Sequence, residues 1–149
     1  MPLQFFPFNR QDLPDCLAIY DSVAAAYFIP QDREDFADFL IRYNDPYFIG
    51  RLDGIAAACG GFRLKTPTLA SLTWGIVHQR FQRSGLGAEL LRYRIEAARK
   101  LGAEQVEIQT SQLTEGFFQK FGFARIRLIE DDFGPGIHWV EMRKDLTRR

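Results

Sequence analysis

A loop with two closely spaced glycines separates a predicted apolar strand, residues 69–77, from a predicted long helix, residues 85–101. The loop reads Gln82-Arg83-Ser84-Gly85-Leu86-Gly87. The first turn of a helix carries free N–H groups and a partial positive charge of about half an elementary unit. Glycines allow those N–H groups to approach a pyrophosphate without interference from a Cβ atom. The segment is therefore predicted to bind phosphate, with Arg80 and Arg83 adding charge-assisted contacts.

The loop lacks the residues that define two well-known nucleotide-binding motifs. A dinucleotide fingerprint would need a third glycine at Leu90, and a P-loop would need a lysine after Gly87, where Ala88 stands. The two glycines alone also fit a turn in which they only relieve backbone strain. A different kind of nucleotide-binding α/β protein is a competing interpretation, which tight NAD or ATP binding would support.

Length and charge restrict the classes of protein to which the chain can belong. Its 149 residues are close to the commonest domain size, so we expect a single domain over residues 1–149. The 19 basic and 19 acidic residues give no basic excess, and no nucleic-acid partner is expected. No apolar stretch approaches the roughly 20 residues that span a bilayer, and no membrane partner is expected.

Two features favour a cytoplasmic location. Residues 1–4 lack the basic and apolar regions of a signal peptide. Cys16 and Cys59 lie in apolar surroundings without metal-ligand spacing, so we interpret them as reduced core residues.

The remaining pattern predicts a mixed sheet of the α/β (α+β) class. Alternating and aromatic-rich segments predict strands at 3–8, 47–51, 54–64, 69–77, 105–110, 123–130 and 137–142. Apolar residues at helical spacing predict helices at 12–23, 31–43, 85–101 and 113–121. The order combines an antiparallel meander with a strand–helix–strand crossover, which is typical of mixed sheets.

Two motifs at a characteristic separation resemble one enzyme family. The segment Gln82–Gly87 resembles the acetyl-CoA motif Q/R-x-x-G-x-G/A of the GNAT N-acetyltransferases, and the strand ending at Val77 has that family's spacing. A second match, Phe117-Phe118-Gln119-Lys120-Phe121-Gly122-Phe123, resembles the family's helix-to-strand ending. The resemblance is specific over residues 72–123 and architectural elsewhere.

The resemblance implies a GNAT-like mixed central sheet with helices on both faces, and transfer of acetyl from acetyl-CoA to a primary amine. The amine would attack the thioester directly, with no metal, and a backbone N–H near Val77 would polarise the carbonyl. The acceptor would be a small-molecule or peptide amine, and homodimerisation is left open. The implied cofactor-binding residues are Ile76, Val77, Gln82, Arg83, Ser84, Gly85, Leu86, Gly87, Ala88 and Phe118.

The sequence departs from the family pattern at the acid and the base. The usual tyrosine that protonates the departing thiolate is Phe118 here, and the frequent asparagine before that helix is Ser111. Ser111 is a candidate hydrogen-bond donor to the thiolate, and the alternative is that it only caps the short helix. His78 and Glu107 are the remaining candidates for the base. Glu107 is the stronger hypothesis, and a solvent-facing strand position is its alternative.

The acceptor side of the resemblance adds only weak hints. It combines aromatic and acidic residues that would suit a small cationic amine, or that only pack and face solvent: Tyr27, Phe28, Glu34, Asp35, Asp131, Asp132, Phe133 and His138. A second function is a catalytically weak GNAT-fold module that binds CoA for sensing or scaffolding. The phenylalanine at position 118 is its main support, and turnover would distinguish the two.

Overall fold

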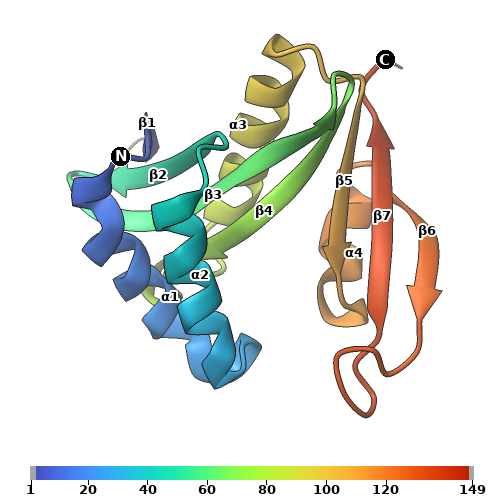
Figure 1. Ribbon diagram of the computed structural model, residues 1–149, viewed down its shortest axis with the longest axis horizontal. Coiled ribbons are helices and arrows are strands. Elements are labelled where there is room, and N and C mark those ends of the chain that lie inside the picture. Colours follow the sequence, from blue (N-terminus) through green and yellow to red (C-terminus); the bar gives the residue numbers. More distant parts are fainter. Residues whose placement is uncertain (1–2, 148–149) are drawn as a thin grey trace. The chain divides into compact units, whose positions relative to one another are not determined.

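The chain folds into one mixed sheet with helices packed against it (Figure 1). The computed structural model describes residues 3–147. The strands are β1 (Leu3–Pro7), β2 (Tyr47–Leu52), β3 (Ile55–Thr66), β4 (Leu69–Val77), β5 (Gln105–Thr110), β6 (Ala124–Ile129) and β7 (Trp139–Asp145). The helices are η1 (Arg10–Asp12), α1 (Leu13–Tyr27), α2 (Pro30–Arg42), η2 (Gln79–Phe81), α3 (Leu86–Lys100) and α4 (Gln112–Lys120). This order confirms the fold class predicted from the sequence.

Strand pairing gives the sheet the order β1-β2-β3-β4-β5-β7-β6. The pairs β1–β2, β2–β3, β5–β7 and β6–β7 are antiparallel, whereas β4 and β5 are parallel where Leu69 to Ser71 pair with Gln105 to Glu107. The Asp53-Gly54 turn between β2 and β3 has positive φ at both residues, 54° and 83°. Such turns match the twist of paired strands, so Asp53-Gly54 suits the antiparallel connection of β2 to β3.

The chain divides into two compact units that share three elements. The first unit comprises Met1–Phe62 and Thr73–Arg94, and the second comprises Arg63–Leu72 and Ile95–Arg149. Strands β3 and β4 and helix α3 therefore each contribute to both. The single domain expected over residues 1–149 stays a prediction.

Aromatic packing forms the core of the first unit. Figure 1 shows α1 and α2 on one face of its strands and α3 on the other. Tyr20 and Phe36 are buried between the helices and the sheet, with ring centroids 5.6 Å apart. Trp74 of β4 packs against Phe36 at 5.0 Å and stacks on Phe28 at 6.1 Å. The core therefore reaches the strand that precedes the glycine loop.

Cys16 and Cys59 lie within this core as buried, free thiols, as the sequence predicts. Their mutual hydrogen bond and burial raise the pKa of Cys16, so its sulfur stays protonated and unreactive.

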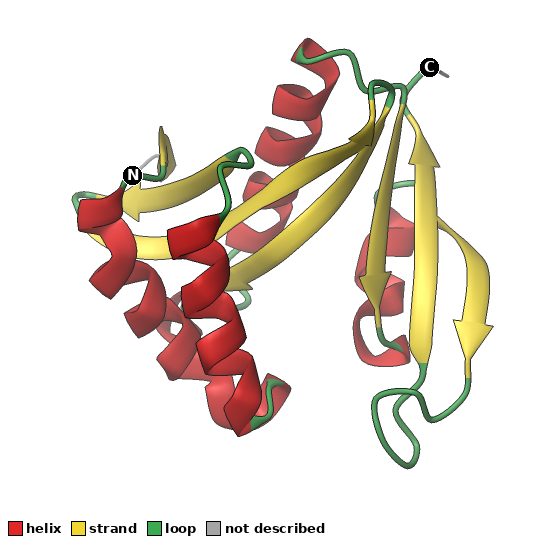
Figure 2. Cartoon of the chain, viewed as in Figure 1, coloured by secondary structure: helices red, strands yellow, loops and turns green. Residues whose placement is uncertain are grey.

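The second unit is built on β5, β7 and β6 with α4 behind β5 and β7, as Figure 2 shows. Val106, Val140 and Met142 are completely buried in it. Arg125 of β6 forms a two-bond ion pair with the buried Glu115 of α4, with both distances 2.6 Å. The guanidinium carbon of Arg127 lies over the indole ring of Trp139, 4.8 Å from the ring centroid. The first contact ties α4 to β6, and the second joins β6 to β7.

Two helices begin one residue away from their predicted starts at residues 12 and 31. Pro30 is the first residue of α2, because its fixed φ and missing N–H suit that position. Helix α1 begins at Leu13, and Asp12 makes no side-chain cap for it. Its carboxylate instead accepts from Asn9 N–H at 3.0 Å and pairs with Arg51 at 3.0 Å.

Candidate functional site

The glycine loop presents an exposed run of backbone ahead of α3. Residues 82–85 follow η2 and are exposed, and α3 begins at Leu86. Arg83 and Gly85 both have positive φ, 63° and 85°. The first helical bond of α3 runs from Glu89 N–H to Gly85 O at 3.1 Å. The N–H groups of the first turn therefore have no partner inside the helix and are available to an anion.

Side chains within the loop fix its shape. Gln82 Nε2 donates to Val77 O at 3.3 Å, and Ser84 Oγ donates to Phe81 O. Gln79 N–H donates to Ser22 Oγ of α1 at 3.0 Å. Because Gln82 and Ser84 bond inside the loop, we expect its backbone and arginines, not these two side chains, to meet a phosphate.

His78 also belongs to this support. Its Nδ1 accepts the N–H of Arg80 at 3.0 Å, which caps the 3-10 turn η2. The contact therefore assigns His78 a structural task and gives no support to a catalytic one.

Strand β4 is bent just before the loop. Trp74 has a φ of 39°, a conformation unfavourable for a bulky side chain, and the exposed Gly75 follows it. The Tyr47 hydroxyl holds this bend by donating to Trp74 O at 2.7 Å. Burial is the main cause that raises the pKa of Tyr47, so this hydroxyl keeps its proton. This irregular segment, Thr73–Gly75, is called the β4 bulge below, and the sequence does not predict it because nothing local requires a positive φ at a tryptophan.

The end of β4 directs one backbone N–H away from β3. His78 N–H donates to Ala57 O of β3 at 2.8 Å. Because successive N–H groups of a strand point to opposite edges, the N–H of Val77 points away from β3. Ile76 is buried and Val77 is half-buried beside it. This orientation suits Val77 as a donor to a carbonyl oxygen.

Glu107 is completely buried, which corrects the alternative of a solvent-facing position. Its Oε2 accepts from Gln109 Nε2 at 2.8 Å and Lys65 Nζ at 3.0 Å, and Oε1 lies 3.5 Å from Arg143 Nη2. Burial opposes ionisation, but the hydrogen bonds from Gln109, Lys65 and Ser71 outweigh it and lower the pKa of Glu107. A carboxylate with a lowered pKa accepts protons poorly at neutral pH. The geometry thus favours a structural role over the base hypothesised from sequence.

Two site residues predicted from the sequence belong to α4: Ser111 precedes its first residue, and Phe118 lies in its last turn. Ser111 Oγ accepts from Leu113 N–H at 3.2 Å, so it caps α4 as the alternative proposed. Phe118 is buried and packs edge-on against Phe117 and Phe123, with centroids 5.1 Å and 5.5 Å away. Ser111 is thus engaged as a helix cap, and the phenyl ring of Phe118 has no proton to give to a leaving thiolate.

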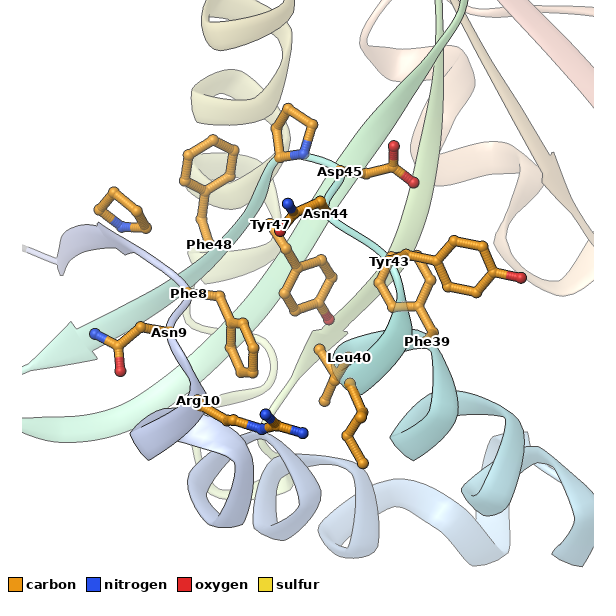
Figure 3. Close-up of a pocket in the computed structure, with 13 residues that line it drawn as sticks. Phe8, Asn9, Arg10, Phe39, Leu40, Tyr43, Asn44, Asp45, Tyr47 and Phe48 are labelled. Carbon is orange, nitrogen blue, oxygen red and sulfur yellow. The ribbon is translucent and has the colours of Figure 1, made fainter.

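A cavity of about 580 Å³ opens in the first unit between α2, the start of β2 and the end of β1 (Figure 3). The rings of Phe8 and Phe39 meet that of Tyr47 edge-on, at 6.0 Å and 5.5 Å. Figure 3 places Arg10 and Asp45 on opposite sides of these rings. None of the acceptor-side residues suggested by the sequence lines it; the lining comes from residues 7–10 and 39–48. The cavity therefore joins aromatic surface to charges of both signs.

The loop and bulge can be compared with known proteins. A family model described as the acetyltransferase (GNAT) family matches residues 14–123, about three quarters of the chain. The chain belongs to this family. The match includes the whole of the glycine loop and extends to Phe123, so the resemblance inferred from the two motifs is confirmed. No curated protein sequence matches the chain significantly.

Solved structures of GNAT acetyltransferases share the fold over almost their entire length. The ribosomal-protein-S18-alanine N-acetyltransferase from Escherichia coli has a TM-score of 0.83 and 18% identity, and 99% of this chain and 96% of that chain are covered. The aminoglycoside 6'-N-acetyltransferase from Enterococcus faecium has a TM-score of 0.79 and 14% identity, with 100% and 99% covered. An acetyl-CoA-bound GNAT acetyltransferase from Elizabethkingia anophelis has a TM-score of 0.77 and 16% identity, with 97% and 98% covered.

As a member of this family, the chain is an enzyme that transfers an acetyl group. No helix among residues 3–147 is long and apolar enough to cross a membrane. Within the same residues, no three His, Cys, Asp or Glu side chains gather closely enough to hold a metal ion.

Arg94 of α3 is a further buried charge next to the β4 bulge. Sequence reasoning missed the burial of Arg94, which was indicated by its position on the apolar stripe of α3, four residues after Leu90.

Proposed function

We propose that this acetyltransferase binds acetyl-CoA through residues 82–88 and the end of β4, and transfers acetyl to a primary amine. The observation that carries the proposal is the exposed loop, in which positive φ at Arg83 and Gly85 precedes the first turn of α3. Such a turn is a ready site for a pyrophosphate. Arg80 and Arg83 are exposed beside it and can add charge-assisted bonds.

The chain's own groups would act on the reacting carbonyl mainly by position. The Val77 N–H would donate to the carbonyl oxygen, and Ile76 would keep the neighbouring side of β4 dry. No acid is supplied at position 118, and Ser111 is occupied as a helix cap. A thiol pKa of about 8.5 makes CoA a tolerable leaving group, so this chemistry can proceed slowly without a dedicated acid.

The acceptor is proposed as a small-molecule or peptide amine. Relatives of the same fold are named for an alanine of a ribosomal protein and for aminoglycosides, which span both kinds of amine. We also propose a cytoplasmic location, where buried, adjacent thiols such as Cys16 and Cys59 stay reduced.

The proposal is tested by calorimetric titration with acetyl-CoA, followed by CoA release across a panel of amines. Micromolar binding together with amine-dependent CoA release supports the enzyme. Binding without release from any class of amine would instead support the CoA-binding sensor. NAD or ATP binding in place of acetyl-CoA would contradict both.

Restoring a phenol at position 118 should increase turnover. We expect Phe118→Tyr to raise kcat by about three- to tenfold, well below the full range of general acid catalysis, because the surrounding groups are not arranged for it. The acetyl-CoA KM should change by less than about twofold, since the binding loop is untouched. Steady-state CoA release measures both constants, and Phe117→Tyr, on the exposed neighbour, is the matched control. An unchanged kcat would mean that position 118 does not face the leaving sulfur.

A further inference from the structure

A buried cation without a matching acid lies beneath the β4 bulge. Only 4% of the Arg94 surface is exposed. Its Nη1 donates to Gly61 O at 3.3 Å and to Thr73 O at 3.5 Å, while its buried Nε finds no acceptor in the described part of the chain. No carboxylate pairs with Arg94 among residues 3–147. Its hydrogen bonds go to neutral carbonyl oxygens, so no acidic side chain neutralises its positive charge.

Two glycines make room for this side chain. A Cβ atom at Gly75 would lie 2.6 Å from Arg94 Nη2 and 2.9 Å from Nη1. A Cβ atom at Gly60 would lie 3.3 Å from the Arg94 Cδ and Nε atoms. Gly75 is itself exposed, so the guanidinium lies directly under accessible backbone of β4. Arg94 and Gly75 therefore form a matched pair.

Buried donors hold the bulge at two consecutive carbonyls. Arg94 donates to Thr73 O from α3, and Tyr47 donates to Trp74 O from β2. The positive φ of Trp74 persists only where the surroundings over-determine it. These two bonds supply that constraint at the point where β4 approaches Val77.

The position of the charge has an electrostatic consequence. Burial lowers the pKa of Arg94 to about 10, so the group remains protonated at neutral pH but is poorly solvated. A charge in such surroundings acts strongly on groups a few ångströms away. Val77 is two residues beyond Gly75, about 6.6 Å along a strand. Negative charge that develops beside the Val77 N–H would be stabilised by this cation.

We propose that Arg94 is a positioning residue of acetyl transfer, which holds the Thr73–Gly75 bulge and stabilises the oxygen that becomes negative beside Val77. This inference rests on the proposed function. In that reaction the amine nitrogen bonds to the acetyl carbon, and electrons move onto the carbonyl oxygen. They return as the carbon–sulfur bond breaks, and the proton lost by the amine ends on the thiolate.

The test compares Arg94→Met, whose unbranched side chain fills similar space without charge, with Arg94→Lys, which keeps the charge. We expect Arg94→Met to bind acetyl-CoA within about threefold of wild type but to lose about tenfold in kcat, less than loss of a direct oxyanion donor. The infrared carbonyl band of bound acetyl-CoA labelled with ¹³C at its carbonyl should move towards its free frequency. Arg94→Lys should recover part of both effects. Arg92→Met, on the exposed side of the same helix, should change neither.

A second variant keeps the test valid if removal of Arg94 unsettles the fold. Gly75→Ala displaces the guanidinium without removing it, so its loss of kcat should be several-fold smaller in the Arg94→Met background. Equal losses in both backgrounds would overturn the inference. An Arg94→Met variant with wild-type kcat and carbonyl band would overturn it while leaving the proposed function intact. Absence of acetyl-CoA binding and turnover in the wild type would overturn both.

Discussion

Gly85→Glu should weaken acetyl-CoA binding at least about 100-fold, which corresponds to about 2.7 kcal/mol. The new side chain would bring a negative charge to the start of α3, where the helix dipole and free N–H groups favour an anion. Apart from Gly85 and its two chain neighbours, no atom of residues 3–147 lies within 4 Å of a Cβ placed at Gly85, so the variant has space and should remain folded. The φ of 85° still opposes any side chain, and we expect about 1–2 kcal/mol of destabilisation.

Gly85→Ala separates backbone strain from charge and bulk. It carries the same unfavourable φ but adds only a methyl group, so its affinity should fall by less than about tenfold. Calorimetric titration of the wild type and both variants measures the difference. Similar dissociation constants for wild type and Gly85→Glu would show that the pyrophosphate binds elsewhere.

Glu107→Gln should lower the free energy of unfolding by about 2 kcal/mol at pH 7. It removes the negative charge that accepts hydrogen bonds from Lys65 and Gln109 inside the second unit. Loss of a fully buried ion-pair partner often costs more, but the side chains of Lys65 and Arg143 are 39% and 37% exposed and can turn to water. Urea unfolding of both proteins measures the difference.

The effect should depend on pH in one direction. The pKa of Glu107 is lowered in the folded protein, so the native state favours its ionised form. The stabilisation is therefore complete above the unfolded pKa, about 4.3, and is lost as the pH falls through the lower folded pKa. The difference between wild type and Glu107→Gln should shrink in that acid range.

Glu141→Gln is the matched control for this experiment. Glu141 of β7 lies 3.8 Å from Arg143 and 3.9 Å from Arg127, so its pairs are long and should contribute less than about 1 kcal/mol. The pH–rate profile should keep its shape in Glu107→Gln if the carboxylate is structural. A lost acid limb in that profile would return Glu107 to the role of base.

Local signals account for what could be predicted from the sequence. Residues 69–77 and 105–110 were predicted as strands with the bounds that the structure has, because β-branched and apolar runs there end at glycine, proline or polar residues. The glycine loop was also predicted, since its glycines and the amphipathic helix after it lie within one short segment.

Features that depend on distant residues could not be predicted in the same way. The burial of Glu107 arises from Lys65 and Arg143, which approach it from β3 and β7. The place of Arg94 on α3 depends on glycines of two strands, Gly60 of β3 and Gly75 of β4. The local sequence settles neither case: Glu107 also fits a solvent-facing strand position, and nothing near Arg94 in the sequence shows the space that accepts its guanidinium.

The two tryptophans give each compact unit its own fluorophore. Trp74 packs among phenylalanines at the bend of β4, whereas Trp139 lies against the guanidinium of Arg127 on β7. Tryptophan emission from a Trp139→Phe variant would therefore come from the bend alone, and tryptophan emission from Trp74→Phe from the strands beside α4. Tryptophan fluorescence of the two variants, without an added label, can thus show whether cosubstrate binding first changes the surroundings of the bend or those of the unit that carries Phe118.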